Sequence, residues 1–205
     1  MQFAGKSAPE CLDVTPEQRQ LADAMQAVYL ARDAELREKF DRSLPFGDAL
    51  FDRWERARRL GFGEGASVYN SAAIFGSVTA GDKTWIGPYV VLDGSGGGID
   101  IGRYCSIAAG VHIYTHDTVH WALSGGVLPF RMGAVRVGDC TYIGSQSVIA
   151  AGVTIGTRCV VAANSLVNRD VPDATIVGGS SARILGRVIG EGQAVRLEFL
   201  DKAAG

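Results

Sequence analysis

The sequence lacks the features that would carry it across a membrane or tie it to a charged polymer. Residues 1–16 contain no apolar core of a secretory signal, and no run approaches 18 uncharged apolar residues, which argues against secretion and against a membrane span. Twenty Lys and Arg against 22 Asp and Glu give a net charge of −2, so no basic footprint for nucleic acid or a membrane surface is indicated. We therefore expect a cytoplasmic protein that binds no nucleic acid.

Signatures of metal sites and disulfides are also missing. The chain has four cysteines and three histidines, but no two cysteines form a C-x-x-C pair and none shares a ligand spacing with a histidine. These patterns argue against a structural zinc site and against a disulfide framework, and they predict reduced thiols. The cysteines are Cys11, Cys105, Cys140 and Cys159.

An amphipathic pattern predicts a first helix over 15–43. Thr15 suits the N-cap, Pro16 suits the first helical position, and Gln18 completes a capping box. One apolar stripe runs along the segment and comprises Leu21, Met25, Val28, Tyr29, Leu36 and Phe40.

A second helix is predicted over 46–60, with Leu50, Phe51 and Trp54 facing inward. The arginines of this segment are expected to form a solvated face, and they are Arg53, Arg56, Arg58 and Arg59. We assign 1–65 to an N-terminal helical segment that caps one end of the following domain or shapes its acceptor site.

From Val68 onward, aliphatic residues recur every six positions, a period that belongs to neither a helix nor an alternating strand. Thirteen of fourteen positions are Ile, Leu or Val, and the phase survives a three-residue slip through 95–98 and a longer interruption after Ile113. The positions are Val68, Ile74, Ala80, Ile86, Leu92, Ile101, Ile107, Ile113, Val137, Ile143, Ile149, Ile155, Val161 and Val167. Glycine often follows, at Gly81, Gly87, Gly102, Gly138, Gly144 and Gly156.

This hexapeptide pattern predicts a triangular coil of three short strands per turn, stacked as parallel sheets. The aliphatic residues fill the interior, and smaller side chains four positions later fill the corners, which explains Cys105 and Cys159 as compact apolar fillers. Glycine and asparagine are expected where a corner needs a positive φ or a close backbone approach. The fold class is mainly β, a parallel β-helix of about five coils over 66–188, followed by a C-terminal tail over 189–205.

Residues 116–134 are predicted to leave the prism as an inserted loop, because the repeat keeps its phase across them. The loop is rich in apolar and aromatic groups, so we expect a neighbouring subunit or a ligand to cover it. All three histidines lie in or beside it, and on a helix their spacing would form a metal face. His112 belongs to a strand-forming hexad, however, so no metal site is predicted. His112 and His120 are expected to be ordinary solvated residues, whereas His116 at the loop root is the candidate functional group.

The stretch 101–188 resembles the hexapeptide-repeat acyltransferases, in particular the coenzyme-A-dependent sugar O-acetyltransferases. The resemblance rests on Tyr-Thr-His-Asp at 114–117, Tyr-Ile-Gly-Ser at 142–145 and Val-Gly-Gly-Ser-Ser-Ala-Arg-Ile-Leu-Gly-Arg at 177–187. Leu-Asp-Gly-Ser-Gly-Gly at 92–97 and Trp-Ala-Leu-Ser-Gly-Gly at 121–126 are similar to the lipopolysaccharide-type branch. The resemblance implies a left-handed coil, a homotrimer with active sites between subunits, and acetyl-CoA as co-substrate.

The resemblance also implies roles for single residues. His116 is the general base, because an alcohol is a weak nucleophile until its proton is removed during attack, and Asp117 or a backbone carbonyl holds its other ring nitrogen. The backbone N–H groups of Gly144 and Ser145 are the expected oxyanion donors. The positions expected along coenzyme A are Ser145, Ala151 and Ala163 for the pantetheine arm, and Asn168, Arg169 and Arg183 for the nucleotide end.

Two further residues are candidates for the acceptor. Asp93 aligns with an acceptor-binding acidic residue of the family, although a turn aspartate before glycine would look the same. Trp121 would stack on a sugar ring or anchor the loop to its neighbour. The chain departs from the family at Ser181, where the usual Gly-x-Pro-Ala-basic ending has proline.

The leading hypothesis is a metal-independent acetyltransferase that moves an acetyl group from acetyl-CoA directly to a hydroxyl of a sugar or saccharide. One alternative is N-acylation of an amino-sugar. A second is a zinc hydratase similar to the γ-class carbonic anhydrases, although no histidine precedes His112 or follows the loop to supply ligands from other coils. A third is a non-catalytic β-helix that acts as an assembly module.

Overall fold

The computed structural model describes residues 15–200 in two compact units, one ending at Leu50 and one beginning at Phe51. Cys11, predicted to be a reduced thiol, lies outside the described residues. Among those residues, no helix is long and apolar enough to cross a membrane.

The first unit is built around α1 (Pro16–Phe40). Its start is as predicted: the Gln18 N–H donates to Thr15 Oγ1 at 3.3 Å, and the Thr15 N–H donates to Gln18 Oε1 at 2.9 Å. The helix ends three residues before the predicted 43, because Asp41 adopts a left-handed conformation with φ of 50°. The apolar stripe is mostly exposed: Leu36 is buried, whereas its other aliphatic members are 45–62 % exposed.

The predicted helix over 46–60 is wrong, because the segment forms two helices, α2 (Phe46–Leu50) and α3 (Arg53–Arg59). Asp52 ends the first and caps the second, since its Oδ1 accepts the N–H groups of Trp54 and Glu55 at 2.8 Å each. Phe51 and Trp54 are exposed rather than inward, at 56 % and 47 %.

Helix α3 covers the first coil of the second unit. Ala57 is buried in the hydrophobic core, and the Arg56 guanidinium donates to the backbone carbonyls of Tyr69 and Ala72. The expectation of a fully solvated arginine face is therefore wrong at Arg56, and also at Arg53, whose Nη1 donates to the Tyr69 hydroxyl at 2.9 Å. Helix α3 lies in the same compact unit as the coils, so the boundary between units falls at Leu50 rather than at the predicted residue 65.

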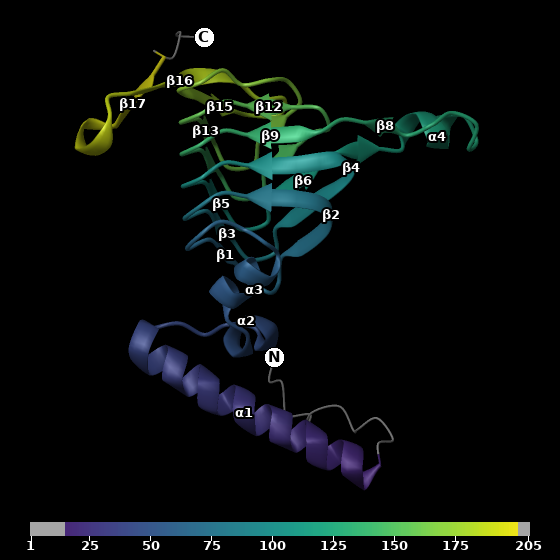
Figure 1. The fold of residues 1–205 in the computed structure, drawn as a ribbon, viewed down its shortest axis with the longest axis vertical. Coiled ribbons are helices and arrows are strands. Elements are labelled where there is room, and N and C mark those ends of the chain that lie inside the picture. Colours follow the sequence, from purple (N-terminus) through teal and green to yellow (C-terminus); the bar gives the residue numbers. More distant parts are fainter. Residues whose placement is uncertain (1–14, 201–205) are drawn as a thin grey trace, which may run out of the picture. The chain divides into compact units, whose positions relative to one another are not determined.

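The second unit is a left-handed parallel β-helix with three faces, as the sequence and its resemblance predicted (Figure 1). Face 1 contains β1 (Ser67–Val68), β3 (Trp85–Ile86), β5 (Ser106–Ile107), β10 (Tyr142–Ile143), β13 (Val160–Val161) and β15 (Thr175–Gly178). Face 2 contains the first halves of β2 (Ala73–Ala80) and β4 (Val91–Ile101), with β6 (His112–Tyr114), β11 (Val148–Ile149) and β14 (Leu166–Val167). Face 3 contains the second halves of β2 and β4, with β9 (Val135–Val137) and β12 (Thr154–Ile155).

We call the turn between faces 1 and 2 corner A, that between faces 2 and 3 corner B, and that between faces 3 and 1 corner C. Thirteen of the fourteen repeat positions are buried at 6 % exposure or less, and Ile74 of the first coil is partly buried. The hexad phase therefore identifies the interior of the prism correctly.

The corners use glycine and asparagine in part as expected. Left-handed φ values fall on Asn164 and on glycines such as Gly110 and Gly152. They also fall on residues not expected there, which are Lys83, Tyr89, Tyr104, Cys140, Gln146, Arg158 and Ala174. The glycines that follow the repeat residues instead permit close approach between coils. A Cβ on Gly138 would lie 2.6 Å from the Gly156 carbonyl carbon, and one on Gly144 would lie 2.5 Å from the Ala163 nitrogen.

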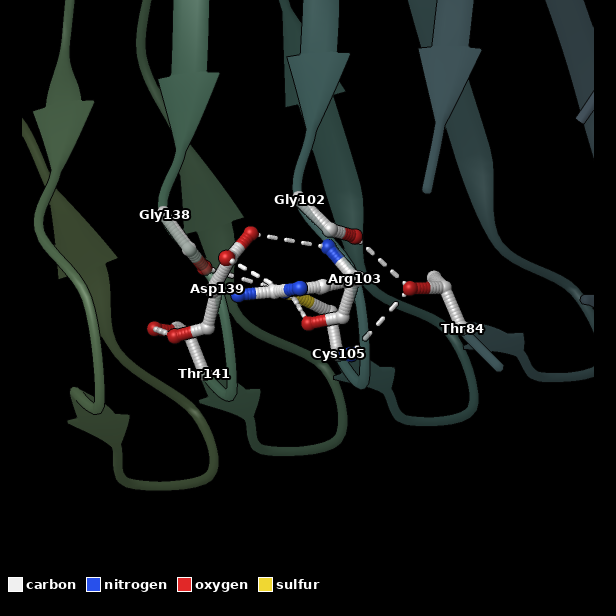
Figure 2. A network of polar contacts seen from close by, with 7 residues as sticks. All are labelled: Thr84, Gly102, Arg103, Cys105, Gly138, Asp139 and Thr141. Carbon is white, nitrogen blue, oxygen red and sulfur yellow. Dashed lines mark hydrogen bonds and ion pairs between the residues drawn. The ribbon is translucent and has the colours of Figure 1, made fainter. Parts of the chain in front are cut away.

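Corner C carries a ladder of alternating threonine and cysteine side chains (Figure 2). Thr84 Oγ1 donates to the Gly102 carbonyl at 2.7 Å and accepts the Cys105 N–H at 3.1 Å, and Cys105 Sγ donates to Gly138 at 3.2 Å. Thr141 repeats the pattern of Thr84 two coils later. The predicted apolar fillers thus also link successive coils, and burial raises the pKa of the Cys105 and Cys159 thiols.

The C-terminal end is closed by an antiparallel extension of face 1. β16 (Arg183–Ile189) pairs with β15, and β17 (Arg196–Phe199) pairs with β16 after a 3₁₀ turn at Gly192–Ala194. The predicted boundary at residue 188 therefore falls inside a strand, and residues 189–199 of the predicted tail belong to a β-hairpin.

Candidate active site

Corner B is where two successive coils are lengthened. In the second coil, β4 continues through the three-residue phase slip at 95–98 and passes from face 2 to face 3 as one strand. In the third coil, the chain leaves the prism after Tyr114 and returns at β9. The slip and the inserted loop therefore lie beside each other.

The inserted loop has a defined root. β7 (His116–Asp117) pairs antiparallel with β8 (Arg131–Met132), and α4 (Val119–Leu123) lies between them in the chain. The Gly133 N–H donates to the Thr115 carbonyl at 2.8 Å where the loop rejoins the prism. Figure 1 shows this loop projecting from the column at one corner.

His116 faces the carboxyl group of Asp93 across corner B. His116 Nδ1 lies 3.9 Å from Asp93 Oδ2, and the two side chains are 26 % and 19 % exposed. Nδ1 is itself buried and has no hydrogen-bond partner among the described residues. The distance is too long for a hydrogen bond, so the contact is electrostatic in this structure.

The surroundings of Asp93 favour the ionised form of its carboxyl group. Burial acts to raise its pKa, but hydrogen bonding by Ser95 and the nearby His116 outweigh burial, so the pKa lies below its ordinary value. The Ser95 N–H donates to Asp93 Oδ1 at 3.1 Å, which leaves Oδ2 as the oxygen nearer the histidine.

Thr115 and Gly96 hold the two coils in this arrangement. Thr115 Oγ1 donates to the Asp93 carbonyl at 2.7 Å and accepts the Gly96 N–H at 2.7 Å, and the side chain is completely buried. Gly96 packs directly against the Thr115 backbone and the base of the His116 side chain, since a Cβ there would lie 2.3 Å from the Thr115 carbonyl oxygen and 2.7 Å from His116 Cβ. Neither residue was singled out from the sequence.

Asp117 does not hold the histidine. Its Oδ1 accepts the Val119 N–H at 3.1 Å at the start of α4, so the expectation that it orients the His116 ring is wrong. The carboxylate that faces the ring comes from the neighbouring coil instead.

Aromatic residues of the loop pack around the histidine. Phe130 stacks on the His116 ring with centroids 6.3 Å apart and an interplanar angle of 24°. Trp121 meets Phe130 edge-on at 5.9 Å, which anchors one side of the indole within the loop. Trp121 remains 46 % exposed, so contact with an acceptor stays a prediction.

The other two histidines lie apart from this pair. His112 Nδ1 is 2.9 Å from the Tyr114 hydroxyl on the outer surface of β6, and His120 is exposed on α4. In the part of the chain that the structure describes, no three His, Cys, Asp or Glu side chains gather as a metal site would require.

The prediction of two backbone oxyanion donors fails for Gly144 and stays open for Ser145. The Gly144 N–H donates to the Val161 carbonyl at 2.8 Å, so it is engaged in coil stacking, and the expectation that it is a free donor is wrong. The Ser145 N–H has no acceptor within residues 15–200 and stays a candidate.

The structure separates the three predicted pantetheine positions. Ser145 and Ala163 lie at corner A in adjacent coils, where the Asn164 N–H donates to the Ser145 carbonyl at 2.9 Å. Ala151 lies at corner B beside the loop root, because a Cβ on Gly133 would come within 3.4 Å of the Ala151 carbonyl carbon.

The predicted nucleotide-end residues do come together. Asn168, Arg169 and Arg183 line one pocket of about 300 Å³ near the C-terminal end. Asn168 Nδ2 donates to Ser181 Oγ at 3.1 Å, so the serine that replaces the family's proline contributes a polar contact here.

The comparisons with a family model and with solved structures agree on one family. The family described as bacterial transferase hexapeptide (six repeats) matches residues 134–169. The hexapeptide-repeat-containing acetyltransferase VCA0836 from Vibrio cholerae is 33 % identical, with a TM-score of 0.60 over 85 % of this chain and 94 % of that chain. A second structure of that protein, 31 % identical, is a complex with acetyl coenzyme A.

Two curated relatives match shorter stretches. The putative acetyltransferase YvoF of Bacillus subtilis is 46 % identical over 27 % of this chain and 33 % of its own. The chloramphenicol acetyltransferase of Morganella morganii is 32 % identical over 40 % of this chain and 48 % of its own. The chain thus spans half or less of the length of these two relatives.

Proposed function

This chain belongs to the hexapeptide-repeat acyltransferase family, and on that premise we propose that it transfers an acetyl group from acetyl-CoA to a hydroxyl of a saccharide acceptor. The observation that carries the proposal is the His116–Asp93 pair at corner B, a histidine facing an anionic carboxylate at the root of an exposed loop. The acetyl-CoA complex of the similar Vibrio cholerae enzyme supports the choice of donor.

His116 acts as the general base. Asp93 favours the tautomer with a proton on the buried Nδ1, which leaves the lone pair on Nε2 for the acceptor hydroxyl. The 3.9 Å separation in the free protein shortens when the substrates bind, as catalytic hydrogen bonds commonly do. The histidine ring is held in orientation by the stacked Phe130.

The transfer is direct. As Nε2 removes the hydroxyl proton, the acceptor oxygen forms a bond to the thioester carbon, and the resulting oxyanion accepts a hydrogen bond from the Ser145 N–H. Collapse of this intermediate breaks the carbon–sulfur bond, and the protonated histidine returns its proton to the departing thiolate of coenzyme A. No covalent acyl-enzyme forms.

The active site is completed by a second subunit of a homotrimer. Within one chain, Ser145 lies at corner A and His116 at corner B, with all of face 2 between them. A site that uses both residues therefore needs corner A of one chain beside corner B of the next. The exposed apolar residues of the loop, such as Leu123 at 83 % and Val127 at 81 %, are then covered by the neighbour.

Coenzyme A runs along the interface where corner A of one chain meets corner B of the next, toward the C-terminal pocket. Ser145 and Ala163 leave room for the pantetheine arm beside the coil backbone, Ala151 lies nearer the acyl group, and Arg183 with Asn168 binds the nucleotide phosphates. An Arg183→Met protein should show a KM for acetyl-CoA raised about tenfold with kcat little changed. A lowered kcat at an unchanged KM would place Arg183 elsewhere.

A histidine exchange tests the mechanism. His116→Ala should lower acetyl transfer about 10²- to 10⁴-fold while the protein keeps its oligomeric mass and its affinity for acetyl-CoA. His120→Ala is the matched control and should retain full activity, because its side chain is exposed on α4. Full activity in the His116→Ala protein would remove the proposed mechanism.

The acceptor is identified by measuring release of coenzyme A with nucleotide sugars, free sugars, lipid-linked saccharides and their amino-sugar counterparts. Turnover confined to hydroxyl acceptors supports the proposal. Turnover confined to amino-sugars would make the enzyme an N-acyltransferase that uses the same histidine.

A further inference from the structure

The C-terminal hairpin presents an open strand edge. β17 is the last strand of the eight-stranded sheet, and within residues 15–200 it pairs only with β16. Val195, Leu197 and Phe199 are 49 %, 48 % and 60 % exposed, and Figure 1 shows the hairpin extending from the C-terminal end of the column. An exposed apolar edge of this kind is normally blocked or paired.

The backbone of this edge is oriented for pairing. The Val188 N–H donates to the Ala174 carbonyl at 2.8 Å, so the backbone groups of Val188 point toward β15. Leu197 lies directly opposite Val188, and its N–H and C=O groups therefore point away from β16. By the alternation of an antiparallel strand, the backbone groups of Phe199 point the same way.

We infer that β17 pairs antiparallel with β17 of a second copy of this chain, about a two-fold axis through Leu197. The pattern Val-Arg-Leu-Glu-Phe over 195–199 is self-complementary about that axis. Arg196 lies opposite Glu198 of the second copy, Val195 lies opposite Phe199, and Leu197 lies opposite its own equivalent. Every cross-strand pair is then either oppositely charged or apolar.

The same axis also satisfies both faces of the new sheet. Val195, Leu197 and Phe199 of the two copies lie on one face and bury each other. On the other face, Glu198 lies between Arg187 of its own hairpin, which is its direct neighbour across β16, and Arg196 of the second copy. An unrelated protein strand would match this order of charges only by chance, which favours a second copy as the partner.

Charge exchanges test the pairing. In its own hairpin Arg196 lies opposite Ile189, so Arg196→Glu places like charges only across the interface. Two Arg–Glu pairs become two Glu–Glu pairs, and the association constant should fall at least about tenfold. The triple variant Arg187→Glu/Arg196→Glu/Glu198→Arg restores two opposite pairs across the interface and keeps opposite charges across β16, so it should restore association, whereas the control Arg59→Glu should change nothing.

The readout is particle mass by light scattering and sedimentation over a range of concentrations. The wild-type particle should have twice the mass of the Arg196→Glu particle, and the triple variant should match the wild type. Leu197→Lys, which places a charge at the centre of the apolar face, should halve the mass as well.

Far-UV circular dichroism and thermal unfolding establish that each variant is folded. Equal masses for the wild type and the folded Arg196→Glu protein would overturn the inference, as would a folded triple variant that stays dissociated. Acetyl transfer is measured on the same samples and should not change, because β17 lies away from corner B; failure of the pairing and failure of the proposed function are thus distinguishable.

Discussion

Replacing Gly96 with alanine should damage catalysis without touching a catalytic group. Gly96 is not in the left-handed region, so its backbone accepts an alanine, and the effect comes from space alone. A Cβ at this position would lie 2.3 Å from the Thr115 carbonyl oxygen and 2.7 Å from His116 Cβ. Both contacts belong to the coil that carries the histidine.

The size of the effect follows from these distances. Ordinary van der Waals contact begins at 3.4 Å, so the 2.3 Å contact must lengthen by about 1.1 Å. Relieving it moves the start of β7 away from Asp93. Overpacking of this kind costs about 1–3 kcal/mol and lowers the melting temperature by roughly 2–12 °C. A displacement of about 1 Å at a catalytic group lowers kcat by about 10²-fold.

Gly138→Ala provides the matched control. Its Cβ would lie 2.6 Å from the Gly156 carbonyl carbon, so it strains the coil stacking in the same way, but at corner C. Both variants are assayed by thiol release from acetyl-CoA with the preferred acceptor and by thermal unfolding. Both should lose thermal stability, and only Gly96→Ala should lose kcat. Equal losses of kcat in the two variants would refute the claim that corner B positions the histidine.

Three further results are expected. Thr141→Val should lower the free energy of unfolding by about 2–4 kcal/mol in denaturant titrations, because the Gly156 carbonyl and the buried Cys159 N–H lose their partner. In the control Thr154→Val, whose side chain is exposed, the free energy of unfolding should change by less than about 0.5 kcal/mol. In a protein lacking Cys11, a thiol reagent should label Cys140 rapidly and the two buried corner C cysteines only on global unfolding, because burial raises their pKa values; rapid labelling of all three would contradict the ladder. The pKa of Asp93 lies below its ordinary 3.8, so its ionisation stabilises the fold above that pH. In pH-dependent denaturant titrations, the stability advantage of the wild type over Asp93→Asn should be largest above the ordinary pKa and be lost as the pH falls through the lower folded-state value.

The interior of the prism was predictable because its signal is periodic. Residues separated by one hexad occupy successive faces, and the requirement for a large aliphatic side chain recurs at each one. The start of helix α1 could be predicted equally well, because Thr15 and Gln18 form a local capping box and Pro16 occupies the first helical position. A capping box involves only residues close together in the sequence, so tertiary packing does not change it.

The proposed catalytic pair, His116 and Asp93, was only half predictable. His116 is marked by its place at the root of the loop, whereas its partner Asp93 precedes it by 23 positions and belongs to the preceding coil. Asp117 is adjacent in sequence and was one of two candidates, beside a backbone carbonyl, to hold the ring, but its Oδ1 accepts the Val119 N–H at the start of α4. Asp93 was expected only to contact the acceptor. Contacts between coils depend on how the turns stack, and a phase slip shifts that stacking.

Counting residues by the full coil of eighteen rather than by the hexad of six would have shown that the three predicted pantetheine positions lie at two different corners. Ser145 and Ala151 are six residues apart, and so they must lie at successive corners. Ser145 and Ala163 are eighteen apart, which places them at the same corner, and Ala151 shares its corner with Arg169 by the same arithmetic. The helix break at Asp52 had no comparable signal, because an aspartate suits a helix N-cap and a helix surface alike.

The glycines of the phase slip show how a stacked coil accommodates a functional corner. Lengthening one turn pushes its backbone against the turn below, and at Gly94 the gap is so small that a Cβ would lie 2.1 Å from the Ser77 carbonyl oxygen. Gly76 meets the same strand from the other side, where a Cβ would lie 2.6 Å from the Ser95 nitrogen. Glycine is therefore needed on both coils before Asp93 can face the next coil. Paired glycines at one corner, one on a lengthened coil and one on the coil beside it, consequently mark a place where a β-helix departs from simple stacking in order to bring two side chains together.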